Sequence, residues 1–300
     1  MSQNGRCPPP PPLPACCPQT LAGPAQKRKL YQTIASGRTP VEGDYTEARV
    51  LLGQREASFR TDLLWVLVNS YVPSLIQDGP QCGLVALWMA AHLRQPQLNI
   101  DMETVTQTAL NRAYTAQGEM FSAQNMALLA EEICCCRAQL LSGGLRDNNA
   151  LSIIKHLWDR QPVLIPYDED FNHAPCKRSG HKAHWAVASG VLLGLDHGSL
   201  DKQDVRPDPS LPWLYLPTTA GTPCPLSNTL PREVYILAKQ GKSLRYQIWS
   251  LDCIAESNDQ LRTMDPQREN NGTQYVLPEG GVEAGLLGQA VMLHTRSLKQ

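Results

Sequence analysis

The division of the chain near Pro162 constrains its fold more than any other feature. Before it, apolar residues recur at helical spacing over 82–91, 104–116, 122–136 and 148–160. After it come short β-type runs at 163–167, 184–193, 213–216, 234–238 and 246–251. Helices that precede strands, instead of alternating with them, favour an α+β domain over a βαβ fold. We therefore expect a helical layer packed on a mostly antiparallel sheet.

The N-terminal end has a composition that cannot form a core. Eight of the first 24 residues are proline, with Pro8–Pro12 unbroken, which favours extended polyproline II. The sequence predicts a disordered proline-rich tail over 1–26, a polar approach segment over 27–59 and one folded domain over 60–300. The tail is either a stiff spacer or a ligand for an aromatic-lined groove, as in partners of profilin, SH3 or EVH1 domains.

Charge and composition restrict the class of protein further. The 27 basic and 28 acidic residues give a formal net charge of −1, which argues against a nucleic-acid partner. The longest uncharged stretch, 209–231, is interrupted by prolines, so we expect no membrane span. Prolines also replace the apolar core of a secretory signal. The ten cysteines include adjacent ones, which fits reduced thiols and a cytoplasmic location.

A candidate nucleophile lies where a loop leads into the first of these helices. Cys82 follows the loop 77–81 and begins an apolar helix. A helix N-terminus stabilises a thiolate, which is the reactive form of cysteine. Gly83 lacks a Cβ and would allow a substrate carbonyl to approach, and a Gln77 side-chain N–H together with the Cys82 backbone N–H could form an oxyanion hole. The alternative is a small buried apolar cysteine.

His184 is the candidate base for this thiol. It begins the run His-Trp-Ala-Val-Ala-Ser-Gly, and no other histidine of the chain begins an apolar strand. A sheet holds such a side chain rigidly, so it can face a helix N-terminus as a cysteine–histidine pair requires. A buried core histidine is the alternative.

The two motifs together resemble the papain-like superfamily, in the style of the bacteriocin-processing peptidases. The run from Gln77 to Met89, the later 239–243 and Trp249-Ser250, and the proline-rich leader are similar to the actin-processing cysteine peptidases, over about residues 60–295. This resemblance implies a papain-like fold and a cytosolic cysteine aminopeptidase that removes the N-acetylated first residue (Met or Cys type) from immature actin. It also implies that the leader contacts profilin. The implied reaction requires no cofactor.

The resemblance implies a third residue that orients the histidine, on a strand after the histidine strand. Asp252 is our prediction, with Asp196 and Asn258 as alternatives. Papain-like enzymes usually place the oxyanion glutamine six residues before the cysteine, where this chain has Ile76. The oxyanion role is therefore predicted for Gln77, with Gln81 open.

Two further segments have competing interpretations. Gly241-Lys242-Ser243 suggests a phosphate loop, but Ile236 stands where the first glycine is needed, so a hairpin turn is predicted. His173, Cys176, His181 and His184 crowd into a polar stretch that contains Pro175 and Gly180. We expect a loop beside the catalytic histidine there and no metal.

End-specific cleavage requires that one side of an open papain-like groove be closed. The proline-rich insertion 196–231 is predicted to form that wall, with 168–182 as the alternative. A different thiol-dependent acyl hydrolase or transferase, of the deubiquitinase kind, would use the same residues. A catalytically silent proline-rich adaptor is the interpretation from another class.

Overall fold

The computed structural model describes residues 45–94, 96, 98–201, 203–226 and 231–295. The predicted tail over 1–26 lies outside these residues, as does most of the approach segment. Within the described part of the chain, no helix is both long and apolar enough to cross a bilayer.

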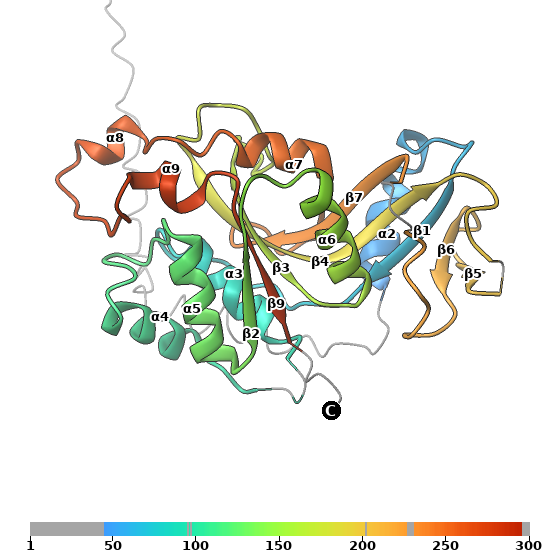
Figure 1. Ribbon diagram of the computed structural model, residues 1–300, viewed down its shortest axis with the longest axis horizontal. Coiled ribbons are helices and arrows are strands. Elements are labelled where there is room, and N and C mark those ends of the chain that lie inside the picture. Colours follow the sequence, from blue (N-terminus) through green and yellow to red (C-terminus); the bar gives the residue numbers. More distant parts are fainter. Residues whose placement is uncertain (1–44, 95, 97, 202, 227–230, 296–300) are drawn as a thin grey trace, which may run out of the picture.

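Helices and strands alternate irregularly along the chain (Figure 1). The helices are α2 (Thr46–Gln54), the 3-10 turn η1 (Glu56–Ser58), α3 (Cys82–Ala91), α4 (Met102–Asn111), α5 (Ala123–Cys134), α6 (Asp147–Trp158), α7 (Leu251–Asn258), α8 (Pro266–Glu269) and α9 (Gly281–Leu286). The strands are β1 (Leu64–Asn69), β2 (Arg137–Leu141), β3 (Val163–Asp168), β4 (Ala183–Leu195), β5 (Val205–Pro207), β6 (Leu214–Pro217), β7 (Glu233–Gln240), β8 (Gln247–Ser250) and β9 (Ala290–His294).

The strands form one sheet around the long strand β4. The order is β2-β9-β3-β4-β1-β6-β5, with β7 and then β8 added beside β4. All described pairings are antiparallel except that of β1 with β6. The α+β prediction with a mostly antiparallel sheet is therefore confirmed.

Alternating side chains of the sheet pack into two cores. Trp185 and Val187 of β4 join a core with α2, α3, α4 and α5, whereas Ala186 and Ala188 join a second core with α6 and α7. Figure 1 shows α6 and α7 in front of the sheet. Helices thus cover both faces, because the strands have apolar residues on both sides and each side must be buried.

The separation of helices from strands is less strict than the sequence indicates. The four helical patterns and the five strand patterns each match an element. However, β1 and β2 precede Pro162, and α7, α8 and α9 follow it. The apolar run from Leu63 to Val68 contributes most of β1, and it is apolar throughout because both of its faces are buried in the sheet.

The folded domain starts earlier than the predicted residue 60. Ala48 and Leu52 on one face of α2 are buried, and Phe59 stacks against Trp65 at 5.1 Å between ring centroids. Residues 45–59 therefore belong to the packed body and are not an approach segment. Burial of their apolar side chains stabilises the domain.

Candidate active site

The loop over 70–81, which we call the nucleophile loop, is attached to the β7–β8 hairpin. Gln77 N–H donates to Gly241 O at 2.7 Å, and Ser74 Oγ donates to Leu244 O at 2.8 Å. The fully buried ammonium of Lys239 donates to Val72 O at 2.8 Å and pairs with Glu47 at 2.8 Å. These contacts fix the point at which the chain enters α3.

Cys82 is the first residue of α3, as the sequence predicts. All ten residues of this helix are buried, which explains why it is apolar all round. Burial raises the pKa of the Cys82 thiol, while the backbone amide of Trp185 and the ammonium of Lys242 lower it. Cys82 shares a core with Trp185, the residue that follows His184 on β4.

Gly83 has a packing role that differs from the one expected. A Cβ at this position would lie 2.9 Å from Met120 and 2.9 Å from Met126. The absence of a side chain thus lets α3 pack closely against α5 and against the segment that precedes it. The approach of a substrate carbonyl at Gly83 stays a prediction.

His184 is the second residue of β4 and pairs with Tyr167 of β3. Its ring is 2% exposed, and Nε2 lies 3.1 Å from Gln240 Oε1. Burial lowers the pKa of the imidazole to about 4, although the carboxylate of Glu169 opposes this shift. The histidine is therefore neutral near pH 7.

Gln240 determines which ring nitrogen of His184 carries the proton. Its Oε1 also accepts the Lys242 backbone N–H at 2.6 Å, so this amide atom acts as an acceptor. The His184 Nε2 must then donate to it, which leaves Nδ1 of the neutral ring with a free lone pair. Nδ1 is consequently the nitrogen that can accept a proton.

Gln240 thus has the orienting position that the sequence interpretation gave to Asp252. Asp252 is exposed in the first turn of α7. The preceding Ser250 pairs with Tyr235, which pairs with Leu192, eight residues beyond His184 and roughly 26 Å along the strand. The prediction was wrong in geometry because β8 returns along β7 away from the histidine.

The two alternatives to Asp252 are also distant from the imidazole or otherwise engaged. Asp196 pairs with Arg232 at 3.0 Å beyond the far end of β4, twelve residues from His184 and roughly 40 Å along the strand. Asn258 is buried, and its Nδ2 donates to Pro166 O at 2.8 Å. Neither has a described contact with the ring of His184.

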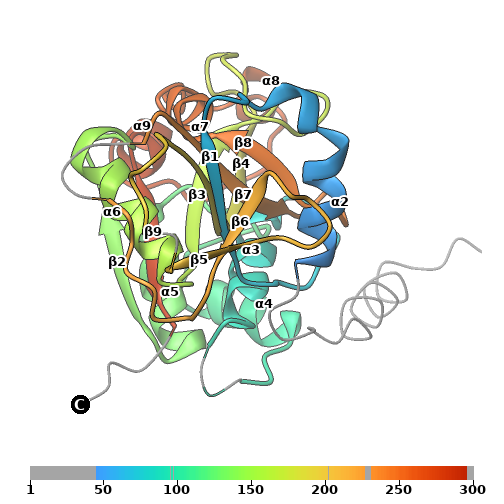
Figure 2. The same ribbon diagram turned by 90° about the vertical axis from the view of Figure 1, so that its right-hand side faces the viewer.

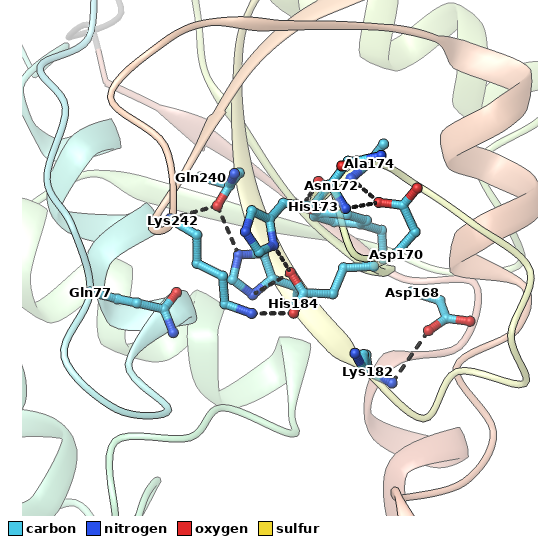
Figure 3. A network of polar contacts seen from close by, with 12 residues as sticks. Gln77, Asp168, Asp170, Asn172, His173, Ala174, Lys182, His184, Gln240 and Lys242 are labelled. Atoms are coloured by element: carbon cyan, nitrogen blue, oxygen red, sulfur yellow. Dashed lines mark hydrogen bonds and ion pairs between the residues drawn. The ribbon is translucent and has the colours of Figure 1, made fainter. Parts of the chain in front are cut away.

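The two candidate oxyanion glutamines both lie in the nucleophile loop, and Gln81 directly precedes Cys82. Gln77 Nε2 donates to Gly79 O at 2.7 Å, which leaves its second N–H. Gln81 is the N-cap residue of α3, and its side chain packs against Gly118. Figure 3 places Gln77 on the same side of the site as Lys242. This geometry favours Gln77, whose oxyanion role remains a prediction.

Glu169 is a site residue that the sequence interpretation missed. It follows β3 directly, is 6% exposed, and places Oε2 3.7 Å from Nδ1 of His184 and 3.1 Å from Nδ1 of His173. Its other oxygen pairs with Lys242 (Figure 3). Burial raises the pKa of Glu169, but His184 and Lys242 outweigh that effect, so the net shift is downward. The sequence did not indicate this position, because Glu169 is one of several charged residues in the polar run 168–182.

The histidine-rich stretch forms the expected loop beside His184. His173 and His184 converge on Glu169, while Cys176 N–H bonds to Asp168 O at 2.8 Å. Among the described residues, no group of His, Cys, Asp and Glu has the arrangement to hold a metal ion. The turn at 241–246 is the predicted hairpin.

The arrangement can perform nucleophilic acyl transfer. A thiol at a helix N-terminus lies against the strand that carries a neutral histidine, and an amide holds that histidine with its basic nitrogen free. These features define the class of thiol-dependent hydrolases, in which cysteine attacks a carbonyl and histidine transfers the proton.

Comparisons with known proteins identify the family. A family model described as actin maturation protease-like, C-terminal domain, matches residues 72–192. The actin maturation protease of Danio rerio is 60% identical over 274 residues, which are 91% of this chain and 89% of that protein. Those of Xenopus tropicalis and Homo sapiens are each 48% identical, over 94% and 89% of this chain and 89% and 77% of theirs. The chain belongs to the actin maturation protease family, and it is therefore a peptidase.

A solved structure gives a more distant similarity. The crystal structure of a C39-like peptidase from Bacillus anthracis matches 76% of this chain and 95% of that chain, with a TM-score of 0.39 and 12% identity. A match at this level assigns no residue. The site therefore rests on the geometry of this chain.

Proposed function

We propose that this chain is a cysteine aminopeptidase that removes the N-acetylated first residue, of the Met or Cys type, from the immature actin N-terminus. The name of the relatives supports actin as the substrate. The observation that carries the mechanism is the hydrogen bond between Gln240 and Nε2 of His184, because it leaves Nδ1 as a base on the strand that contacts the thiol.

The mechanism follows from these positions. Nδ1 of His184 takes the proton of Cys82 Sγ, and the thiolate attacks the carbonyl of the first residue. The Cys82 backbone N–H and a side-chain N–H of Gln77 stabilise the oxyanion. The imidazolium then protonates the leaving amine of the shortened actin, and water, deprotonated by Nδ1, releases the acetylated residue from the thioester.

The direct test is the intact mass of immature actin after incubation with the enzyme. Wild-type protein is expected to remove one acetylated residue, and Cys82→Ala is expected to remove none. Cys253→Ala is the matched control, since Cys253 is an exposed free thiol, and it should act like the wild type. Cleavage by Cys82→Ala would refute the assignment of the nucleophile.

The outcomes also separate the alternative functions. Recovery of the removed acetylated residue as an amide of an added amine, instead of as the free acid, would indicate a transferase. Unmodified actin together with an unreactive Cys82 would indicate the silent adaptor.

The proline-rich tail is part of the proposal as a contact with profilin. Its composition is that of a polyproline ligand, although it lies outside the described residues. Deletion of residues 1–24 should leave hydrolysis of a short acetylated peptide unchanged. It should slow processing of the profilin–actin complex by about tenfold or more, because tethering raises the effective concentration. Unchanged processing of both substrates would make the tail a spacer. The proposed reaction places the protein in the cytoplasm with actin.

A further inference from the structure

The reactive pair lies in surroundings that oppose its charged form. Cys82 is 8% exposed and His184 is 2% exposed. Burial raises the pKa of the thiol and lowers the pKa of the imidazole. Proton transfer from Sγ to Nδ1 nevertheless creates a thiolate and an imidazolium in this place. The reaction is therefore favoured by any fixed charges that are complementary to those products.

A second ion pair lies beside this one. Glu169 comes from the start of the β3–β4 connection, and Lys242 comes from the β7–β8 hairpin turn. The Lys242 ammonium contacts Glu169 Oε1, while Glu169 Oε2 lies 3.7 Å from Nδ1 of His184. The Glu169 side chain is 8% exposed and that of Lys242 is 32% exposed, so solvent screens this pair less than a surface pair.

The direction of this ion pair matches the charges that the reaction creates. The hairpin that carries Lys242 also binds the nucleophile loop, through Gly241 O and Gln77 N–H at 2.7 Å. Lys242 has the largest effect of any charged group on Cys82 and lowers the pKa of the thiol. Glu169 has the corresponding position for His184 and raises the pKa of the imidazole. Glu169 also raises the pKa of Cys82 and Lys242 also lowers the pKa of His184, but each of these opposing effects is the smaller of the two on its group. The positive end thus favours the thiolate and the negative end favours the imidazolium.

We propose that Glu169 and Lys242 are positioning residues that form a permanent ion pair aligned with the transient Cys82–His184 ion pair and thereby favour proton transfer from Sγ to Nδ1. In this step the S–H bond breaks, its electron pair stays on sulfur, and the proton binds the lone pair of Nδ1. No other reactant is needed. The inference rests on the proposed function only in taking Cys82 and His184 as the reactive pair.

The other groups that face Glu169 are consistent with this role. His173 Nδ1 lies 3.1 Å from Oε2 and helps to hold the carboxylate in place. Tyr167 of β3 is fully buried. Its burial raises the pKa of the phenol most, and the negative charges of Glu169 and Cys82 raise it further. Arg268 of α8 adds a smaller effect that lowers the pKa of Cys82. The phenol thus stays neutral near pH 7, and Lys242 is the cation in contact with the carboxylate.

The test is the pH dependence of Cys82 alkylation by iodoacetamide, followed by peptide mass in the full-length protein. A thiolate–imidazolium pair reacts at a rate that is independent of pH around neutrality, and the rate rises again only when the remaining thiol ionises. Glu169→Gln and Lys242→Met are each expected to lower the neutral plateau about tenfold, as a change of about one pKa unit does.

The alkaline rise distinguishes this role from a structural one. It should move to lower pH in Glu169→Gln, because a repelling carboxylate is lost, and to higher pH in Lys242→Met, because an attracting ammonium is lost. Glu256→Gln is the matched control, since it removes a carboxylate that pairs with Lys177 on the surface, and it should match the wild type.

Three outcomes decide the proposal. A plateau of wild-type height in both variants would overturn it, and so would alkaline shifts in the same direction. If Glu169→Gln does not fold, as judged by circular dichroism, the partly exposed Lys242→Met decides the question. A wild-type Cys82 without a plateau would instead refute the cysteine–histidine pair, and with it the proposed function.

Discussion

The two connections that flank β4 use the same stabilising device at opposite ends of that strand. In the β3–β4 connection (169–182), the buried carboxylate of Asp168 accepts the backbone N–H groups of Arg178, Gly180 and Lys182. In the β4–β7 connection (196–232), the buried Asp208 accepts those of Ser210 and Leu211 and pairs with Arg49 at 2.8 Å. Each aspartate satisfies loop amides that would otherwise lack acceptors.

The difference between these connections lies in the strand end from which they start. The β3–β4 connection borders His184 and supplies Glu169. The β4–β7 connection starts beyond Leu195 and adds β6 and β5 beside β1, as Figure 2 shows. The insertion expected to wall the cleft therefore extends the sheet at the end remote from His184. The position of the insertion follows from the register of the strands and not from its number of prolines.

The largest difference should appear when the two aspartates are changed alike. Asp168→Asn and Asp208→Asn should each destabilise the protein by about 2–4 kcal/mol, since each leaves loop amides unpaired. Asp168→Asn should also lower kcat about thirtyfold or more, because the connection that carries Glu169 and leads into His184 loses the hydrogen bonds that hold it in place. Asp208→Asn should retain kcat. Thermal unfolding and peptide turnover per folded molecule measure both effects, and equal kcat values would remove the distinction between the loops.

Strand β7 offers the same contrast between its two ends. Gln240→Ala removes the acceptor for His184 Nε2–H and should lower kcat about 10- to 100-fold with a small change in KM. Glu233→Gln changes the opposite end of the strand, where Glu233 accepts from Tyr235 at 3.1 Å, and should leave both constants unchanged. Steady-state kinetics on an acetylated peptide distinguish them. A Gln240→Ala enzyme with normal kcat would return the orienting role to another residue.

Shortening the insertion should have a smaller effect on specificity. Removal of residues within 201–212 is expected to leave end-specific cleavage unchanged, because β6 pairs with the part of β1 that lies beside residues 193–194 of β4, remote from His184. Peptides with extra residues before the normal cleavage site provide the assay, with products identified by mass. New internal cleavage by a folded variant would show that the insertion closes the groove after all.

The smallest effect concerns a buried histidine away from the site. Burial, with the nearby His294, lowers the pKa of His156 from 6.5 to about 4. The unfolded chain therefore binds more protons between these values, and the free energy of unfolding falls as the pH drops from about 6.5 to 4. His156→Gln should weaken that fall by about 1–3 kcal/mol and leave turnover at neutral pH unchanged. Urea unfolding at pH 7 and pH 5 measures it; an unaltered slope would contradict the assigned shift.

The sequence predicted the elements better than their arrangement. Helix periodicity and the apolar start of β4 are local properties, so the sequence correctly predicted that Cys82 begins a helix and that His184 lies at the start of a strand. Gln240 and Glu169 were missed because their roles depend on which strand neighbours β4 and on the face to which each side chain points. Asp252 was chosen by its order along the chain, which does not show that β8 runs back away from His184.

A neutral His184 at the near end of β4 is proposed as the base for Cys82. The most direct measurement is the rate at which His184→Ala releases the first residue from an acetylated actin N-terminal peptide, with His156→Gln as the buried control. We expect a loss of about 1,000-fold or more for His184→Ala and an unchanged rate for His156→Gln. A folded His184→Ala enzyme that keeps more than about a tenth of the wild-type rate would show that His184 is not the base.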